Sequence, residues 1–300
     1  MEWPPVTREA CTICGRLDAP RVAAIKGRRT DWEFHLRYCA NCGFAWVDNP
    51  WTDFATVYDE AYYRGQGSDV LIDYVDELAH PTVTLRRWEW RGILDLLREL
   101  ALPSDARRWL DFGCGNGGLV KYARETTKPG EWLAGGFEEG WAAQYGRSQG
   151  IPILAREDLA ARCGSFDIVT AVEVMEHTLD PRETLREVRG LLPPGGVFLF
   201  TTGNLAPYAG NLAAWGYVAP EIHLSYFEPR ALARLLEETG FEPRFTGYRP
   251  PHTGIIAYKI LKTLGRKHLA PWMKLLPWSV LSRLAEWRAR FTEFPLGIAR

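Results

Sequence analysis

A glycine-rich turn directly after a short apolar segment constrains this chain most. Residues 109–117 read Trp-Leu-Asp-Phe-Gly-Cys-Gly-Asn-Gly, which predicts a buried strand, then a tight turn, then the start of a helix. Glycine tolerates the backbone conformations of such a turn and lets backbone N–H groups approach a ligand closely. A carboxylate, Asp111, stands near the end of the strand and suits a polar or cationic ligand better than a bare phosphate. The motif therefore indicates a nucleoside cofactor.

Two other interpretations of this turn stay open from these residues alone. Gly113, Gly115 and Gly118 also have the G-x-G-x-x-G spacing of a dinucleotide-binding turn. A glycine-rich turn that binds no ligand is the third interpretation. Motifs elsewhere in the chain have to discriminate among them.

The size and charge of the chain set broad limits on its class. With 300 residues it exceeds a usual single domain, which predicts one large catalytic domain and a small accessory module. A hydrophobic content of 46% and a net charge of −1 exclude a polyelectrolyte. Positive charge nevertheless gathers in residues 251–300, which hold nine Lys or Arg against two Glu. Neither a secretory leader pattern nor an apolar run of about 18 residues is present, so we expect a cytoplasmic protein.

Four cysteines near the N-terminus form two C-x-x-C-G units separated by 24 residues. Each unit places two thiolates on one tight turn, and four thiolates suit a tetrahedral zinc ion without an open coordination position. The alternation of Phe34, Leu36 and Tyr38 predicts a strand before the second unit. Residues 1–50 are therefore predicted to be a zinc-ribbon-like module in which structural zinc is held by Cys11, Cys14, Cys39 and Cys42. A redox pair and four unrelated thiols are the alternatives.

Residues 51–104 are predicted to be a helical linker or cap, broken near His80-Pro81. The tyrosines in this segment (Tyr58, Tyr62 and Tyr63) are expected to serve packing more than ligand binding.

Short apolar runs alternate with amphipathic segments from Arg107 onward, which is the pattern of a doubly wound α/β sheet of the Rossmann-like class. Strands are predicted at 109–112, 132–137, 151–154, 166–172, 197–201, 242–248 and 294–299. Ligands of such sheets bind beyond the carboxyl ends of the strands. Four acidic residues fall at those ends and predict a site there: Asp111, Glu138, Asp158 and Glu173.

Taken together, four segments resemble those of class I S-adenosylmethionine-dependent methyltransferases. They are Asp111–Gly117, the acidic strand end at Glu138, the run Phe166–His177, and Leu191–Val197 with its Pro-Pro-Gly-Gly turn. The resemblance covers about residues 105–250. It implies a seven-stranded sheet in the order 3-2-1-4-5-7-6 with the last strand antiparallel. It also implies S-adenosylmethionine as the cofactor of a domain spanning 105–300.

The resemblance assigns roles to individual residues of this chain. A loop of Gly113, Cys114, Gly115 and Gly117 would surround the methionine and ribose portion of the cofactor. Asp111 would anchor that loop, and Glu138 would accept both ribose hydroxyls. Asp158 resembles the acceptor for the adenine amine, with a plain surface carboxylate as the alternative, and Glu173 lies where the sulfonium side is expected.

Glu173-Val-Met-Glu176-His177 is similar to the E-x-x-E-H run of ubiquinone-biosynthesis O-methyltransferases and small-RNA 2′-O-methyltransferases. In those enzymes two Glu, this His and a later His can hold a divalent cation, and His223 is the later candidate here. The simpler hypothesis makes His177 a general base or an orienting group, with Glu176 and His223 as its catalytic partners.

A segment at 250–292, before the last predicted strand, reads as an insertion of short amphipathic helices that carry tryptophan, leucine and basic residues. A helical lid over the cleft is one interpretation, and peripheral contact with a membrane or an anionic ligand is the other. The net acidic charge of the rest of the chain argues against nucleic acid as a partner.

These observations predict a methyltransferase that acts on a small-molecule acceptor, such as a sugar, a natural product or a quinone-like compound. Oxygen is the favoured acceptor atom. A non-catalytic recruitment module built on a cofactor fold and a nicotinamide-dependent oxidoreductase are the rival hypotheses.

Overall fold

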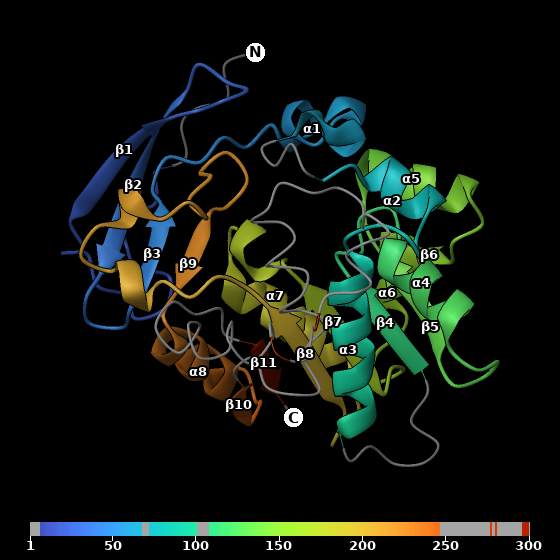
Figure 1. Ribbon diagram of the computed structural model, residues 1–300. Coiled ribbons are helices and arrows are strands. Elements are labelled where there is room, and N and C mark those ends of the chain that lie inside the picture. Colours follow the sequence, from blue (N-terminus) through green and yellow to red (C-terminus); the bar gives the residue numbers. More distant parts are fainter. Residues whose placement is uncertain are drawn as a thin grey trace.

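The computed structural model describes residues 7–67, 72–100, 108–246, 277, 280 and 296–299. Two sheets organise these residues (Figure 1). The larger has seven strands in the order β10-β11-β8-β7-β4-β5-β6, and the smaller has four in the order β1-β2-β3-β9.

Five strands of the larger sheet run parallel, which confirms the predicted α/β class. They are β4 (Arg108–Phe112), β5 (Leu133–Phe137), β6 (Ile153–Leu154), β7 (Ile168–Val172) and β8 (Val197–Thr201). An antiparallel edge follows β8, formed by β11 (Leu296–Ala299) and β10 (Pro243–Thr246). The inner strands β7 and β8 are mostly apolar and are buried over nearly their whole length, as expected for a parallel sheet that is covered on both faces.

Helices cover both faces of this sheet because successive side chains of a strand point to opposite sides. Trp109 packs into one apolar cluster with residues of α3 (Arg87–Glu99), α4 (Gly118–Thr126) and α5 (Gly140–Ser148). Its neighbour Leu110 packs into the cluster on the other face. The helices there are α6 (Arg156–Ala160), α7 (Pro181–Leu191) and α8 (Pro229–Glu238).

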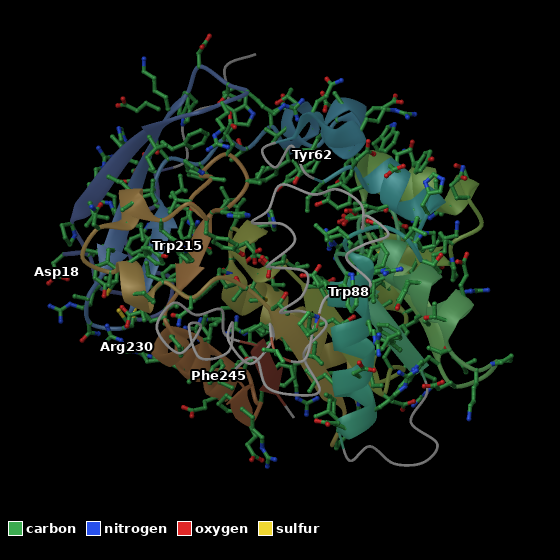
Figure 2. All side chains as sticks on the ribbon, in the orientation of Figure 1. Asp18, Tyr62, Trp88, Trp215, Arg230 and Phe245 are labelled. Carbon is green, nitrogen blue, oxygen red and sulfur yellow. The ribbon has the colours of Figure 1, made fainter. Side chains whose placement is uncertain are left out.

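The smaller sheet combines the N-terminal segment with a strand from far along the chain. Its strands are β1 (Arg21–Lys26), β2 (Glu33–Cys39), β3 (Phe44–Val47) and β9 (Ser225–Phe227). In Figure 1, β9 lies beside β3, with which it pairs antiparallel. Trp215, in the loop that leads to β9, packs against this sheet (Figure 2). The division at residues 50 and 104 stays a prediction, but the N-terminal sheet takes its fourth strand from beyond both.

Short elements connect the two sheets near the carboxyl ends of β4 and β7. The segment that follows β3, which is predicted to be a cap, contains α1 (Phe54–Val57), a π-helical turn (Tyr62–Gln66) and α2 (Tyr74–Ala79). Beyond β7 and β8 come 3₁₀ turns at Met175–His177, Ala206–Tyr208 and Leu212–Ala214.

The basic segment predicted at 250–292 lies outside the described residues, apart from positions 277 and 280. Its roles as a lid or as a membrane or anionic contact therefore stay predictions. Among the described residues, no helix combines the length and the apolar character that crossing a bilayer requires.

We expect Phe227→Ala to lower the free energy of unfolding by about 3–5 kcal/mol, because the ring in β9 is fully buried against Phe44. Phe245→Ala in β10 is the matched control: this ring is 38% exposed, so the loss should stay below about 1 kcal/mol (Figure 2). Urea unfolding of both variants measures the difference. Equal losses in the two variants would contradict a structural role for the packing of β9 against β3.

Candidate active site

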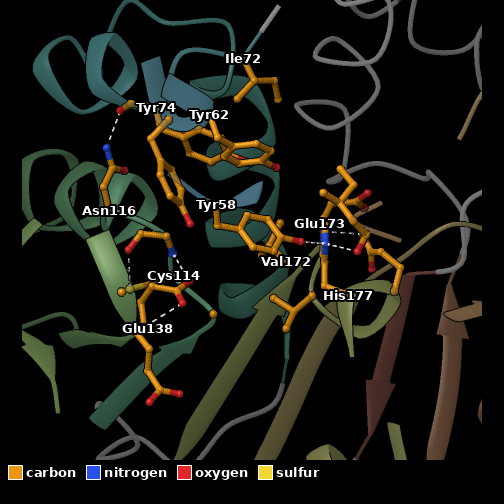
Figure 3. A pocket seen from close by; sticks show the side chains of 18 of the residues that line it. Tyr58, Tyr62, Ile72, Tyr74, Cys114, Asn116, Glu138, Val172, Glu173 and His177 are labelled. Carbon is orange, nitrogen blue, oxygen red and sulfur yellow. Dashed lines mark hydrogen bonds and ion pairs between the residues drawn. The ribbon is translucent and has the colours of Figure 1, made fainter. Parts of the chain in front are cut away.

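A cavity of about 1220 Å³ opens at the carboxyl ends of β4, β5 and β7 (Figure 3). Its walls come from the glycine turn after β4, the segment after β7, the cap helices and the loop at 216–223. This position is the usual binding crevice of an open α/β sheet. The volume exceeds that of most pockets for one small ligand, so the cavity has room for two reactants.

The glycine turn has a conformation that other residues would disrupt. Gly113 and Gly117 have φ angles of 71° and 88°. A Cβ atom on Gly113 would lie 2.6 Å from Cγ2 of Val174, and one on Gly117 would lie 2.5 Å from Cγ2 of Ile151. A Cβ atom on Gly115, in contrast, would come no nearer than 3.8 Å to a neighbouring atom. The turn therefore requires glycine at positions 113 and 117, and it leaves open space on the Cα side of Gly115 that faces the cavity.

Two carboxyl groups stand beside this turn: Asp111 is buried and Glu138 is partly buried. Asp111 accepts a hydrogen bond of 2.6 Å from the Thr170 hydroxyl. Glu138 accepts bonds from the backbone N–H groups of Gly115 (3.0 Å) and Glu139 (2.9 Å). Burial raises the pKa of each of the two carboxyl groups to about 7. Both groups can therefore gain or lose a proton near neutral pH when a ligand binds.

The structure brings most, but not all, of the sequence-predicted cofactor residues to the cavity. The lining includes Asp111, Gly113, Cys114, Gly115, Glu138 and Glu173. Gly117 is not among the lining residues and lies against Ile151 instead. Asp158 is exposed on α6 and does not line the cavity, whereas Arg156 of the same helix does.

Glu173, directly after β7, has an unusual backbone conformation. Its φ of 55° is the one positive value among the non-glycine residues that the structure describes. The Glu173 N–H donates to both the backbone oxygen and the hydroxyl of Thr201, at 3.1 Å and 3.0 Å. Its carboxylate accepts a bond of 2.8 Å from Tyr217. Strain of this kind is commonly retained at functional sites.

Glu176 is buried and shares the Tyr217 hydroxyl with Glu173. One carboxylate oxygen of Glu176 lies 2.5 Å from the Tyr217 hydroxyl, and the other lies 2.8 Å from the hydroxyl of Thr202. Burial, together with the nearby charge of Glu173, raises the pKa of Glu176 to about 8. Because a single hydroxyl proton cannot serve two carboxylates at once, a proton held by Glu176 supplies the second bond.

His177 presents one free ring nitrogen near Glu176. Its Nδ1 atom lies 2.8 Å from the backbone oxygen of Ile222 and 2.9 Å from the Tyr58 hydroxyl (Figure 3). A carbonyl oxygen can only accept, so Nδ1 carries the proton and Nε2 keeps its lone pair. Nε2 is 3.8 Å from a Glu176 carboxylate oxygen. Burial lowers the pKa of His177 to about 4, so the ring is neutral at pH 7.

His223 completes a cluster of three potential ligands. Its Nδ1 atom lies 2.7 Å from the backbone oxygen of Tyr217, and its ring centre is 4.8 Å from that of His177. Glu176, His177 and His223 each offer a ligand atom within 4.8 Å of the others. Histidines whose second nitrogen is bound to a backbone carbonyl are typical metal ligands. The cluster could therefore hold a cation, and it could equally act as a base without one.

Comparison with known proteins decides the family. The model of the family described as "Methyltransferase domain" matches residues 85–244, more than half of the chain. The chain belongs to the methyltransferase domain family. Its sheet, glycine turn and acidic strand ends agree with this membership, and the methyltransferase depends on S-adenosylmethionine.

Curated relatives of the methyltransferase are named ubiquinone biosynthesis O-methyltransferase. The protein from Bordetella avium is 31% identical over 173 residues, which cover 50% of this chain and 68% of the relative. The protein from Dinoroseobacter shibae is 34% identical over 164 residues, which cover 49% of this chain and 65% of the relative.

Solved structures agree on the fold. The structure of Phospholethanolamine N-methyltransferase 2 from Haemonchus contortus has a TM-score of 0.50 and 13% sequence identity to this chain. The match covers 93% of this chain and 70% of the Haemonchus contortus chain. At this identity the likeness concerns the fold alone.

Away from the cavity, the methyltransferase gathers the four cysteines into one cluster. The Sγ atoms of Cys11 and Cys42 are 3.5 Å apart, as are those of Cys14 and Cys39. All four lie within 4.8 Å of one another. Thiolates around one tetrahedral zinc ion, each about 2.3 Å from it, are separated by about 3.8 Å, so the cluster fits that ion.

Two functional candidates escaped the sequence analysis. Tyr58 was expected to serve packing, yet it contacts His177 across 119 residues of chain. The hydroxyl of Tyr217, in the loop between β8 and β9, contacts the carboxyl groups of both Glu173 and Glu176. A tyrosine carries no local signal of such a contact, since only the folded chain brings these segments together.

Proposed function

We propose that the methyltransferase methylates a hydroxyl group of a small quinone-like or phenolic compound, with sugar and natural-product hydroxyls as alternative acceptors. The arrangement of His177 carries this proposal: a neutral ring whose unprotonated Nε2 lies beside a carboxyl group in a cavity for two reactants. The names of the curated relatives also support an O-methyltransferase. Apolar side chains on the acceptor side, among them Phe54, Tyr58 and Ile222, favour a ring over a fully hydroxylated sugar.

We infer that the glycine turn and its carboxyl groups hold the cofactor. The open space beside Gly115 and the partly buried Glu138 fit a ribose, since one carboxylate can accept hydrogen bonds from both ribose hydroxyls. Asp111 suits the ammonium group of the methionine portion. Arg86 lines the same cavity, forms an ion pair of 2.8 Å with Glu89, and suits the carboxylate of that portion. The bound cofactor supplies a methyl group on an electrophilic sulfonium.

His177 then has one chemical task, which is to take the proton from the acceptor hydroxyl at Nε2. Its Nδ1–H remains bound to Ile222 and Tyr58, so the ring keeps its orientation during the transfer. The negative charge of Glu173, which acts to raise the pKa of His177, stabilises the imidazolium that forms. Burial lowers the pKa of His177 to about 4, which makes the ring a weak base, so the negative charge of Glu173 matters for its activity.

We expect His177→Ala to lower kcat by about 10²- to 10⁴-fold, because the proton acceptor is lost, and to leave the Kd of S-adenosylhomocysteine unchanged. Transfer of labelled methyl to catechol, with methyl glucoside as the sugar probe, measures the effect. His80→Ala is the matched control, since the His80 ring is exposed and pairs with Asp76. Full activity of His177→Ala would overturn the role of His177, and transfer to methyl glucoside alone would overturn the phenolic acceptor.

A cation held by Glu176, His177 and His223 is the second candidate mechanism, favoured by their mutual distances and by the carbonyl-bound Nδ1 atoms. Such an ion would lower the pKa of an acceptor hydroxyl. The same assay separates the two mechanisms. Activity that survives EDTA supports the metal-free base, and activity that EDTA abolishes and Mg²⁺ or Mn²⁺ restores supports the cation.

Binding of S-adenosylhomocysteine should weaken as the pH falls below about 7, because the ribose hydroxyls need an ionised Glu138, whose pKa burial raises to about 7. Asp111, whose pKa is also about 7, must likewise be ionised to bind the ammonium group. Two protons must therefore leave on binding at low pH, so Kd should rise by up to about 100-fold per pH unit below about pH 7 and should be constant well above it. Calorimetry from about pH 5.5 to 8.5 measures the slope. Glu138→Gln should make it shallower, whereas Glu157→Gln on the exposed face of α6 should keep it. A Kd independent of pH would contradict the assignment.

We also propose that the cysteine cluster holds structural zinc. The purified protein should contain about one zinc per chain, and Cys39→Ser should lose the zinc and unfold at a lower temperature, since the ion stabilises the folded turns. Cys163→Ser is the control because that thiol is exposed and outside the cluster. Elemental analysis and thermal unfolding provide the measurements. Absence of zinc from the wild-type protein would refute the proposal.

A further inference from the structure

The turn between β1 and β2 reaches from the N-terminal sheet to the loop that carries His223. Its backbone N–H groups at Arg29 and Thr30 donate to one carboxylate oxygen of Glu221, both at 2.8 Å. The Thr30 hydroxyl donates to the same oxygen at 3.0 Å. Glu221 is buried, and a Cβ atom on Gly27 would lie only 2.6 Å from that oxygen. The turn is therefore shaped closely around this carboxylate, one residue before Ile222.

The Arg29 side chain extends from the same turn to the segment that carries Tyr58. Its guanidinium donates to the backbone oxygen of Val57. It also donates to both carboxylate oxygens of Asp59, at 2.9 Å and 3.0 Å. Asp59 in turn accepts the Tyr62 N–H at 2.8 Å. Arg29 thus holds the residues on both sides of Tyr58, and its hydrogen bonds to Asp59 are charge-assisted, which makes them stronger than neutral ones.

These two connections converge on one atom. Ile222, held through Glu221, and Tyr58, held between Val57 and Asp59, are the two partners of Nδ1 of His177. We propose that Arg29 is a positioning residue for methyl transfer: from the β1–β2 turn it holds both groups that orient the His177 ring. The proposal rests on the proposed role of His177 as the base or ligand in the cavity.

The physical consequence concerns the tautomer of His177. A neutral imidazole carries its proton on either nitrogen, and the hydrogen bond at one nitrogen decides which form is present. With Ile222 and Tyr58 in place, the proton stays on Nδ1 and the lone pair of Nε2 faces Glu176. When these partners shift, Nε2 can take the proton and His177 can no longer accept one from the substrate. A displacement of about 1 Å is enough to cost a factor of about 100 in rate.

The test compares four variants of the full-length protein. Arg29→Ala removes the contacts to Val57 and Asp59 but keeps the backbone N–H to Glu221. Glu221→Ala removes the other connection, and Glu221→Gln keeps an oxygen acceptor for the turn. Arg16→Ala is the matched control, because Arg16 lies in the same N-terminal module and forms an exposed pair with Asp18.

We expect Arg29→Ala and Glu221→Ala each to lower kcat for catechol methylation about 10- to 100-fold with an unchanged Kd for S-adenosylhomocysteine. Glu221→Gln and Arg16→Ala should retain kcat within about threefold of wild type. Nitrogen-15 spectra of the histidine rings, assigned with His177→Ala, provide a second measurement. His177 should be in the Nδ1–H form in the wild type and the control, and a mixture of tautomers in Arg29→Ala and Glu221→Ala.

Wild-type kcat and an unchanged His177 spectrum in Arg29→Ala would overturn the proposal. If Arg29→Ala does not fold, the contrast between Glu221→Ala and Glu221→Gln decides, and equal defects in these two would overturn it. A shifted His177 spectrum in Arg29→Ala combined with full activity of His177→Ala would support the positioning and overturn the proposed function, so the two failures are distinguishable.

Discussion

The antiparallel pairing of β9 with β3 joins the two sheets of this methyltransferase, and the geometry of the candidate site depends on it. The loop that precedes β9 carries Tyr217 and His223. Its end is anchored twice, since β9 continues the N-terminal sheet and the Leu224 N–H donates to the backbone oxygen of Glu176 at 2.6 Å. The N-terminal module thereby helps to build the cavity as well as flanking it.

The desolvation of carboxyl groups beside the cavity is the second constraint. The pKa values of Asp111 and Glu138 rise to about 7, and that of Glu176 rises to about 8. Hydrogen bonds from Thr170, from the backbone at Gly115 and from Tyr217 offset part of the cost of burying each group. Such groups respond strongly to a ligand that brings a cation or hydroxyl donors.

Local patterns predicted the elements of this fold well where a segment's own residues decide its structure. The five parallel strands were predicted to within a few residues, because each is a short apolar run bounded by polar or glycine-rich turns. The glycine turn and the two C-x-x-C-G units were recognisable for the same reason. Asp158 shows the limit: its position after a strand is visible in the sequence, but α6 turns its side chain towards solvent and not into the cavity.

The sequence by itself determined the class of fold, the position of the glycine turn and, through the resemblance of its motifs, the S-adenosylmethionine cofactor. These depend on residue types at short spacings. Only the tertiary structure brought Tyr58 to His177, Tyr217 to two carboxylates and Arg29 to Glu221, 192 residues further along the chain. Long-range contacts of this kind have no local signature. They follow from the joining of two sheets, which brings distant loops to one cavity and sets the hydrogen bonds that orient its histidines.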